Sequence, residues 1–225
     1  QSWNGAAVRA GATILRRPEL LMPTIEVPHI SALDVDALRD THNVRVVILD
    51  KDNTIYAPYA DDVHPVVEPG LQRLREKFTK PKTVVVLSNS AGTDDDVGYV
   101  DAQQIEQTVQ LPVVRHNSKK PGCSLDDIFK FLKEGEDGEH LADLQPHQIA
   151  MVGDRILTDV VFGNLHGMVT VHCQPLTEEN DNPAAKIIRC VCVCVCVCVC
   201  VCVFVSLCVR VRAFLFSCLL GSLGA

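Results

Sequence analysis

Short runs of apolar residues recur along the chain, and three of them lead into polar residues, namely Asp50, Ser88 and Asp154. Such runs are typical of strands buried on both faces of a parallel sheet. This pattern constrains the fold more than any other feature of the sequence. The runs cover residues 44–49, 83–87, 111–114, 149–152 and 168–172, of which 111–114 is the weakest.

Segments with a helical spacing of apolar residues separate these runs. Strands and helices that alternate in this way predict a doubly wound α/β fold with a mainly parallel, Rossmann-like sheet. The chain has 225 residues, enough for one such domain with a sizeable core and little room for a second. The expected helices cover about residues 33–39, 71–78, 102–109, 125–132 and 157–165.

The polar residues at the ends of the runs predict where a site lies. In open parallel sheets, ligands bind beyond the carboxyl ends of the strands, near the point where the strand order reverses. Asp50, Ser88 and Asp154 each come just after an apolar run. We therefore expect their side chains at one edge of the sheet.

Four polar segments carry the candidate chemistry: DKDNT (50–54), LSNSAG (87–92), KKP (119–121) and GDRILTD (153–159). Taken singly, the last three are ordinary turns, helix caps or solvated charges. The first resembles part of a calcium loop, but such a loop needs Gly and Glu where this chain has Ile55 and Asp61. Their order, spacing and strand context carry more information than any one of them.

Together the four segments resemble the ordered motifs of the haloacid-dehalogenase superfamily: DxDx[TV], a Ser or Thr after a strand, a Lys, and GDxxxxD. The match covers residues 44–160. The resemblance implies a phosphatase. Only 33 residues separate Asp52 from Val86, and the interval from Ser88 to Lys120 is similar, so we expect little or no cap domain. Asp52 favours a phosphatase over a dehalogenase, which lacks this second aspartate.

The expected chemistry centres on Asp50. A carboxylate attacks the phosphorus of a monoester once a metal ion and cationic donors neutralise the repulsion between the two anions. Asp52 is then expected to protonate the leaving alkoxide and to activate water against the aspartyl-phosphate. The resemblance implies that Mg²⁺ binds the Asp50 carboxylate, the Asp52 backbone carbonyl and the Asp154 carboxylate.

The resemblance assigns the remaining site residues by motif. Ser88 hydrogen-bonds a phosphoryl oxygen, and Lys120, which matches the family position better than Lys119, neutralises negative charge. Asp159 orients the lysine or the hydrated metal. Thr54 and Asn89 are expected to support the site.

A closer resemblance is to mitochondrial and plant-type phosphatidylglycerophosphate (PGP) phosphatases. It is carried by LDKDNTIYAPY, VVVLSNSAG, VVRHNSKKPGC and MVGDRILTDVVFGN, and it extends over about residues 10–175. It implies hydrolysis of PGP to phosphatidylglycerol, a step toward cardiolipin, at an organelle membrane. The expected partner is thus a phospholipid substrate. The protein is expected to be peripheral, on the matrix side of the mitochondrial inner membrane, with the plastid as the alternative.

Other functions remain open from the sequence alone. The same chemistry suits a soluble phosphate monoester or a phosphoprotein, and a non-catalytic membrane-anchored scaffold is an alternative of another class. A response-regulator receiver also combines strand-end aspartates with a Lys-Pro pair. In a receiver that pair follows the last acidic position, whereas Lys120-Pro121 precedes Asp154 here.

Charge and cysteine content exclude further classes. The formal charge is −7, and residues 1–189 carry 19 basic and 28 acidic residues, or −9. Such an acidic body argues against nucleic acid as a partner. Of 11 cysteines, nine lie from Cys190 onward, and the isolated Cys123 and Cys173 imply neither a disulfide framework nor a zinc site.

The two ends of the chain differ in composition from the expected phosphatase domain, residues 41–189. The N-terminal segment, residues 1–40, suits a transit-peptide remnant, a membrane-surface helix or an ordinary packed helix. Residues 190–225 begin with a strict Val-Cys alternation. We interpret this tail as a translated (GT)n dinucleotide repeat in preference to a membrane helix or a strand, and assign it no function.

Overall fold

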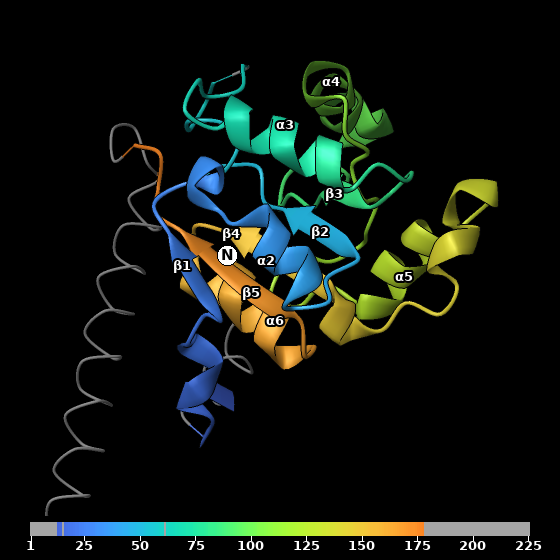
Figure 1. The fold of residues 1–225 in the computed structure, drawn as a ribbon. Coiled ribbons are helices and arrows are strands. Elements are labelled where there is room, and N and C mark those ends of the chain that lie inside the picture. The colour runs from blue at the N-terminus through green and yellow to red at the C-terminus, as the bar shows by residue number, and fades with distance from the viewer. Residues whose placement is uncertain (1–12, 15, 61, 178–225) are drawn as a thin grey trace, which may run out of the picture. The chain divides into compact units, whose positions relative to one another are not determined.

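The structure is a computed structural model, and it describes residues 13, 14, 16–60 and 62–177 (Figure 1). All of them belong to one compact unit, which spans Gln1–Pro183. The Val-Cys tail predicted at 190–225 and the start of the predicted N-terminal segment, residues 1–12, lie outside the described residues. Among the described helices, none has the length and apolar character that a bilayer span requires.

The described strands form one five-stranded sheet in which every pairing is parallel. The strand order is β1-β5-β4-β2-β3. This sheet confirms the predicted α/β, Rossmann-like fold. The strands are β1 (Ile25–Val27), β2 (Val46–Leu49), β3 (Val84–Val86), β4 (Ile149–Gly153) and β5 (Val169–Cys173).

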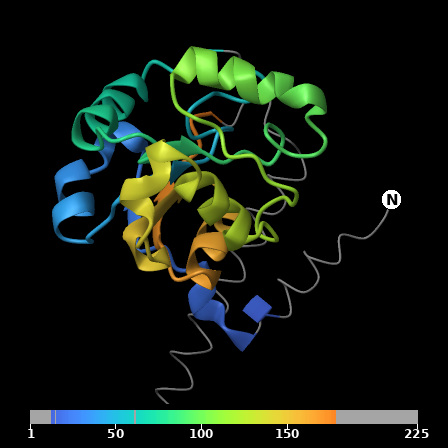
Figure 2. The same ribbon diagram turned by 90° about the vertical axis from the view of Figure 1, so that its right-hand side faces the viewer.

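Helices cover both faces of the sheet. Figures 1 and 2 show α3 and α4 on one side, and α5 and α6 on the other. The α-helices are α2 (Val35–Asp40), α3 (Glu68–Lys77), α4 (Val100–Val109), α5 (Leu125–Lys133) and α6 (Val161–Leu165). Short 3-10 turns are η1 (Pro18–Leu21), η2 (Ile30–Ala32), η3 (Val97–Tyr99), η4 (Glu136–Leu141) and η5 (Pro146–Gln148), and η6 (Ile156–Val160) is a π-turn.

The core has two halves because successive residues of a strand point to opposite faces. In β2, Val47 and Leu49 pack with α2, α3 and α4, whereas Val46 and Ile48 pack with α5 and α6. All four residues of β2 are fully buried. This explains why the strand reads as a continuous apolar run rather than an alternating one.

The N-terminal segment contributes β1, which was not predicted as a strand. β1 pairs with β5 through the register Ile25 to Val171. Next to it, the Thr24 and Thr170 side chains hydrogen-bond each other's backbone N–H groups at 3.0 and 3.2 Å. The division at residue 40 stays a prediction, but residues 25–27 belong to the same sheet as the predicted domain.

The weakest predicted strand, residues 111–114, forms a single parallel bridge between Val86 and Val113. The Val86 N–H donates to the Pro112 carbonyl at 2.9 Å, and the Val114 N–H donates to the Val86 carbonyl at 2.8 Å. The segment therefore runs beside β3 and directs the following residues, up to Lys120, toward the carboxyl edge of the sheet.

The strand order places a reversal point beside β2. The chain moves from β2 outward to β3 and then returns to β4 on the other side of β2. Loops that follow β2, β3 and β4 therefore diverge at one edge and leave space for a site between them.

Candidate active site

Asp50 lies at the carboxyl end of β2. Its backbone N–H donates to the Val152 carbonyl at 2.8 Å, which continues the pairing of β2 with β4 by one residue. The residue is only 4% exposed. The strand thus holds a carboxyl group in a buried position at the edge of the sheet.

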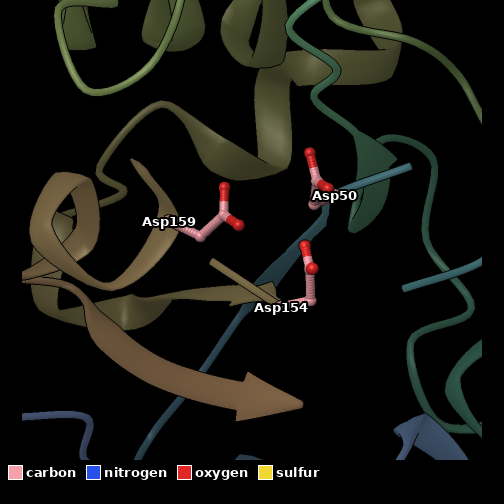
Figure 3. A group of neighbouring side chains, drawn as sticks. All are labelled: Asp50, Asp154 and Asp159. Carbon is pink, nitrogen blue, oxygen red and sulfur yellow. The ribbon is translucent and has the colours of Figure 1, made fainter. Parts of the chain in front are cut away.

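Asp154 and Asp159 lie beside Asp50, and the three carboxylates point into a common space (Figure 3). One oxygen from each lies within 4.8 Å of the others, and all three residues are buried. Gly153 permits this approach, because a Cβ at that position would lie 2.3 Å from Asp159 Oδ2. The glycine of the GDxxxxD motif therefore makes room for the last aspartate of the same motif.

Lys120 joins two of these carboxylates. Its Nζ lies 2.6 Å from Asp50 Oδ1 and 2.7 Å from Asp159 Oδ1, and its side chain is fully buried. Burial alone would lower the pKa of the Lys120 ammonium, but the charges of Asp159 and Asp50 and the hydrogen bonds to them raise it above its usual value. The lysine is therefore a fixed cation in the site.

Asp159 is adapted to hold Lys120. Its Oδ1 pairs with the ammonium, and its Oδ2 accepts the backbone N–H of Arg155 at 3.1 Å. Burial, with a further contribution from Asp50, raises the pKa of the Asp159 carboxyl, although Lys120 acts in the opposite direction. Asp159 Oδ1 thus has an ion-pair partner, and Oδ2 has a hydrogen-bond donor.

Ser88 and Asn89 follow β3, and Asn89 contacts the backbone of Lys120. The Ser88 hydroxyl lies 3.1 Å from the Ser90 hydroxyl, and the residue is fully buried. The Asn89 side chain accepts the Lys120 N–H at 2.7 Å and donates to the Lys120 carbonyl at 3.4 Å. Asn89 therefore holds the backbone of the lysine.

Two predicted residues lie less centrally. The Asp52 side chain is 34% exposed, and its Oδ1 lies 3.5 Å from Lys51 Nζ. Thr54 is buried, and its hydroxyl makes no hydrogen bond with any described residue. Asp52 is outside the buried trio of carboxylates, at a position that solvent can reach.

Sequence analysis did not single out Arg155. Its side chain is 27% exposed, and its Nε lies 3.8 Å from Asp154 Oδ1. Burial alone would lower the pKa of the Arg155 guanidinium, but the surrounding carboxylates raise it, namely those of Asp50, Asp154, Asp159 and Asp52. Arg155 is thus a second cation beside the acidic trio.

The carboxylates fit a divalent metal ion. Asp50 Oδ2 is buried and makes no hydrogen bond with any described residue, which is costly for an anionic oxygen unless a cation binds it. Because Asp159 Oδ1 pairs with Lys120 and Oδ2 accepts the Arg155 N–H, Asp50 and Asp154 are the better candidates for binding a metal ion. Carboxylate oxygens are the ligands that Mg²⁺ and Ca²⁺ prefer.

The fold and the site together define a class of protein. It is an α/β enzyme that carries a group of buried carboxylates able to hold a metal ion, and a buried lysine, at the carboxyl edge of a parallel sheet.

Comparison with known proteins identifies the family. A family model described as mitochondrial PGP phosphatase matches residues 6–177. The chain is 32% identical over 173 residues to the mitochondrial phosphatidylglycerophosphatase of Saccharomyces cerevisiae, covering 77% of this chain and 88% of the yeast protein. The chain belongs to the mitochondrial PGP phosphatase family.

Two photosynthetic relatives are also similar. The chain is 36% identical over 183 residues to the chloroplastic PGP phosphatase 1 of Chlamydomonas reinhardtii, covering 80% of this chain and 63% of the algal protein. It is 29% identical over 175 residues to the chloroplastic/mitochondrial PGP phosphatase 1 of Arabidopsis thaliana, covering 77% of this chain and 47% of the plant protein. The predicted resemblance and the enzyme class, a phosphoric monoester hydrolase, are thereby confirmed.

Proposed function

We propose that this protein is a Mg²⁺-dependent phosphatase that hydrolyses PGP to phosphatidylglycerol through a phosphorylated Asp50. The observation that supports it best is the environment of Asp50. One of its oxygens is bound by Lys120, and the other is buried without a hydrogen bond to any described residue. A carboxylate held in this way is oriented and largely desolvated.

In the first step, the Asp50 carboxylate attacks the phosphorus of the monoester, and the bond from phosphorus to the glycerol oxygen breaks. Asp52 donates a proton to the departing alkoxide, which leaves as the free hydroxyl of phosphatidylglycerol. Lys120 and the Ser88 hydroxyl stabilise the charge on the transferring phosphoryl group. The product of this step is an aspartyl-phosphate.

In the second step, water attacks the phosphorus of the aspartyl-phosphate. Asp52, now ionised, accepts a proton from this water, and the bond from phosphorus to the Asp50 oxygen breaks. Inorganic phosphate leaves, and both aspartates return to their initial states. The partial exposure of Asp52 suits a group that first donates a proton to the leaving group and then accepts a proton from water.

The residues proposed to hold Mg²⁺ are the Asp50 and Asp154 carboxylates, with the Asp52 backbone carbonyl. When bound, the ion would neutralise part of the negative charge that builds up between the carboxylate and the phosphoryl group. Asp159 holds Lys120 in place during both steps.

The substrate proposal draws on the family. The similar proteins are named phosphatidylglycerophosphatases of mitochondria and chloroplasts, and we extend that substrate to this chain. We place the protein at the surface of a mitochondrial membrane, with the plastid as the alternative, because the substrate is a phospholipid.

The test compares phosphate release from short-chain PGP with release from glycerol 3-phosphate, which carries the same reacting group without the lipid. We expect a clearly higher kcat/KM for PGP. Asp50→Asn should lose about 10⁴-fold or more with either ester, since it removes the nucleophile. Glu76→Gln, on the exposed surface of α3, is the matched control and should keep both rates.

A preference for glycerol 3-phosphate over PGP would refute the lipid substrate and favour a soluble ester. An Asp50→Asn protein that retains the wild-type rate would refute the mechanism for any ester.

A further inference from the structure

His116 is buried in the segment that leads from the bridge with β3 to Lys120. The residue is 3% exposed. Its backbone N–H donates to the Gly92 carbonyl at 2.9 Å. Its ring nitrogens both lie close to backbone carbonyl oxygens: Nε2 is 2.9 Å from Ser88 O, and Nδ1 is 2.7 Å from Ser118 O.

This arrangement constrains the protons on the ring. A backbone carbonyl oxygen only accepts hydrogen bonds, whereas a neutral imidazole has one N–H donor and one acceptor nitrogen. A neutral His116 would therefore point the lone pair of one nitrogen at an oxygen lone pair within hydrogen-bonding distance. A ring that carries a proton on both nitrogens satisfies both contacts.

We propose that His116 is a buried imidazolium that acts as a positioning residue, joining the Ser88 backbone to the turn that carries Lys120. This inference rests on the proposed function insofar as Ser88 and Lys120 contact the phosphoryl group.

The hydrogen bonds around His116 link the same two segments more than once. The ring holds the carbonyl of Ser88, and its own N–H holds that of Gly92. Asn89 adds the link to the Lys120 N–H at 2.7 Å. These contacts fix the backbone at Ser88 and the backbone at Lys120 relative to each other, although they come from different segments of the chain.

The two ring contacts bear on the cost of burying a cation at this position. Two hydrogen bonds from a charged donor offset much of the cost of burying the imidazolium. A dianionic phosphoryl group bound at Ser88 would gain further from a fixed positive charge behind that residue.

Nitrogen NMR of the full chain labelled with ¹⁵N-histidine tests the protonation directly. At neutral pH we expect proton correlations from both ring nitrogens of His116, with closely similar nitrogen shifts. His116→Gln assigns the resonances by their loss. The exposed His147, in η5 at the opposite edge of the sheet, is the matched control, and His147→Gln should remove only its own signals.

Kinetics test the positioning role. His116→Phe keeps a ring but no donor, and we expect kcat to fall about 10²-fold, as for a displacement of catalytic groups by about 1 Å. His116→Gln keeps one donor and should recover part of this loss. His147→Gln should keep the wild-type kcat.

A proton on only one ring nitrogen of His116 would overturn the proposal. A wild-type kcat in the His116→Phe protein would also overturn it. If the variants fail to fold, NMR correlations from the backbone to the ring assign the His116 signals in the wild-type protein. The number of protonated ring nitrogens then decides whether the proposal holds. This result needs no substrate, and it therefore stands even if PGP proves not to be hydrolysed.

Discussion

Adjacent lysines 119 and 120 have opposite environments. Lys119 is about half exposed and pairs with the exposed Asp95 at 2.8 Å, whereas Lys120 is buried between Asp50 and Asp159. An exposed ion pair contributes little to stability, but removing one partner of a buried group leaves uncompensated charge.

We therefore predict that Lys120→Met lowers the free energy of unfolding by about 3–5 kcal/mol. The matched change Lys119→Met should cost about 0–1 kcal/mol. Urea denaturation of the two variants makes the comparison. Equal, small losses would show that the Lys120 pairs contribute no more to folding than a surface contact.

Individual site residues differ in how well a single sequence reveals them. Asp50, Ser88 and Asp154 were identified because each follows an apolar run, and that context locates them at the sheet edge. Arg155 and His116 lie inside segments that were recognised. A sequence does not show whether an arginine turns toward carboxylates or whether a histidine ring meets two carbonyls, since both depend on chain segments far apart in sequence.

At the scale of elements, the loop between β3 and α4 is organised by one carboxylate. Asp96 is buried, and its oxygens accept the backbone N–H groups of Gly92, Asp101 and Ala102 at 2.9–3.0 Å. Burial alone would raise the pKa of Asp96, but these hydrogen bonds, with the charge of Arg115, lower it below its ordinary value of 3.8. The carboxylate caps α4 and closes the loop that begins at Ser88.

A pKa lower in the folded than in the unfolded state means that ionised Asp96 stabilises the fold above pH 3.8, and that this contribution is lost as the pH falls through the folded-state value. We predict that Asp96→Asn lowers the free energy of unfolding by about 1.5 kcal/mol at neutral pH, because an uncharged amide with one accepting oxygen replaces two charged acceptors. The difference from wild type should shrink in acid. Urea denaturation across the acid range measures it, and a difference independent of pH would contradict this role.

Strands were predictable in proportion to their apolar character and burial. The other four strands were located from their buried runs, including β3, which is as short as β1. β1 was missed because Ile25–Val27 is only partly buried and contains the charged Glu26. The helix expected at 157–165 divides into the π-turn η6 and α6. That π-turn sets Asp159 toward Lys120, an arrangement that depends on the close packing at Gly153 and is not visible in the periodicity.

At the scale of the whole molecule, the strand order accounts for the site. Because β2 lies between β3 and β4, the segments that follow all three strands meet around Asp50. The parallel sheet and this edge were predictable from strand and helix alternation. The order β1-β5-β4-β2-β3 was not, because pairing with β1 depends on contacts between the two ends of the described chain.

The central claim is that Asp50 becomes phosphorylated during turnover. The most direct measurement is peptide mass spectrometry of the wild-type protein, quenched in acid during turnover of PGP in the presence of Mg²⁺. Acid quenching stops the reaction before the intermediate is fully hydrolysed, and we predict a phosphoryl group on Asp50. An unmodified Asp50, or a phosphoryl group on another residue of an active protein, would contradict the account.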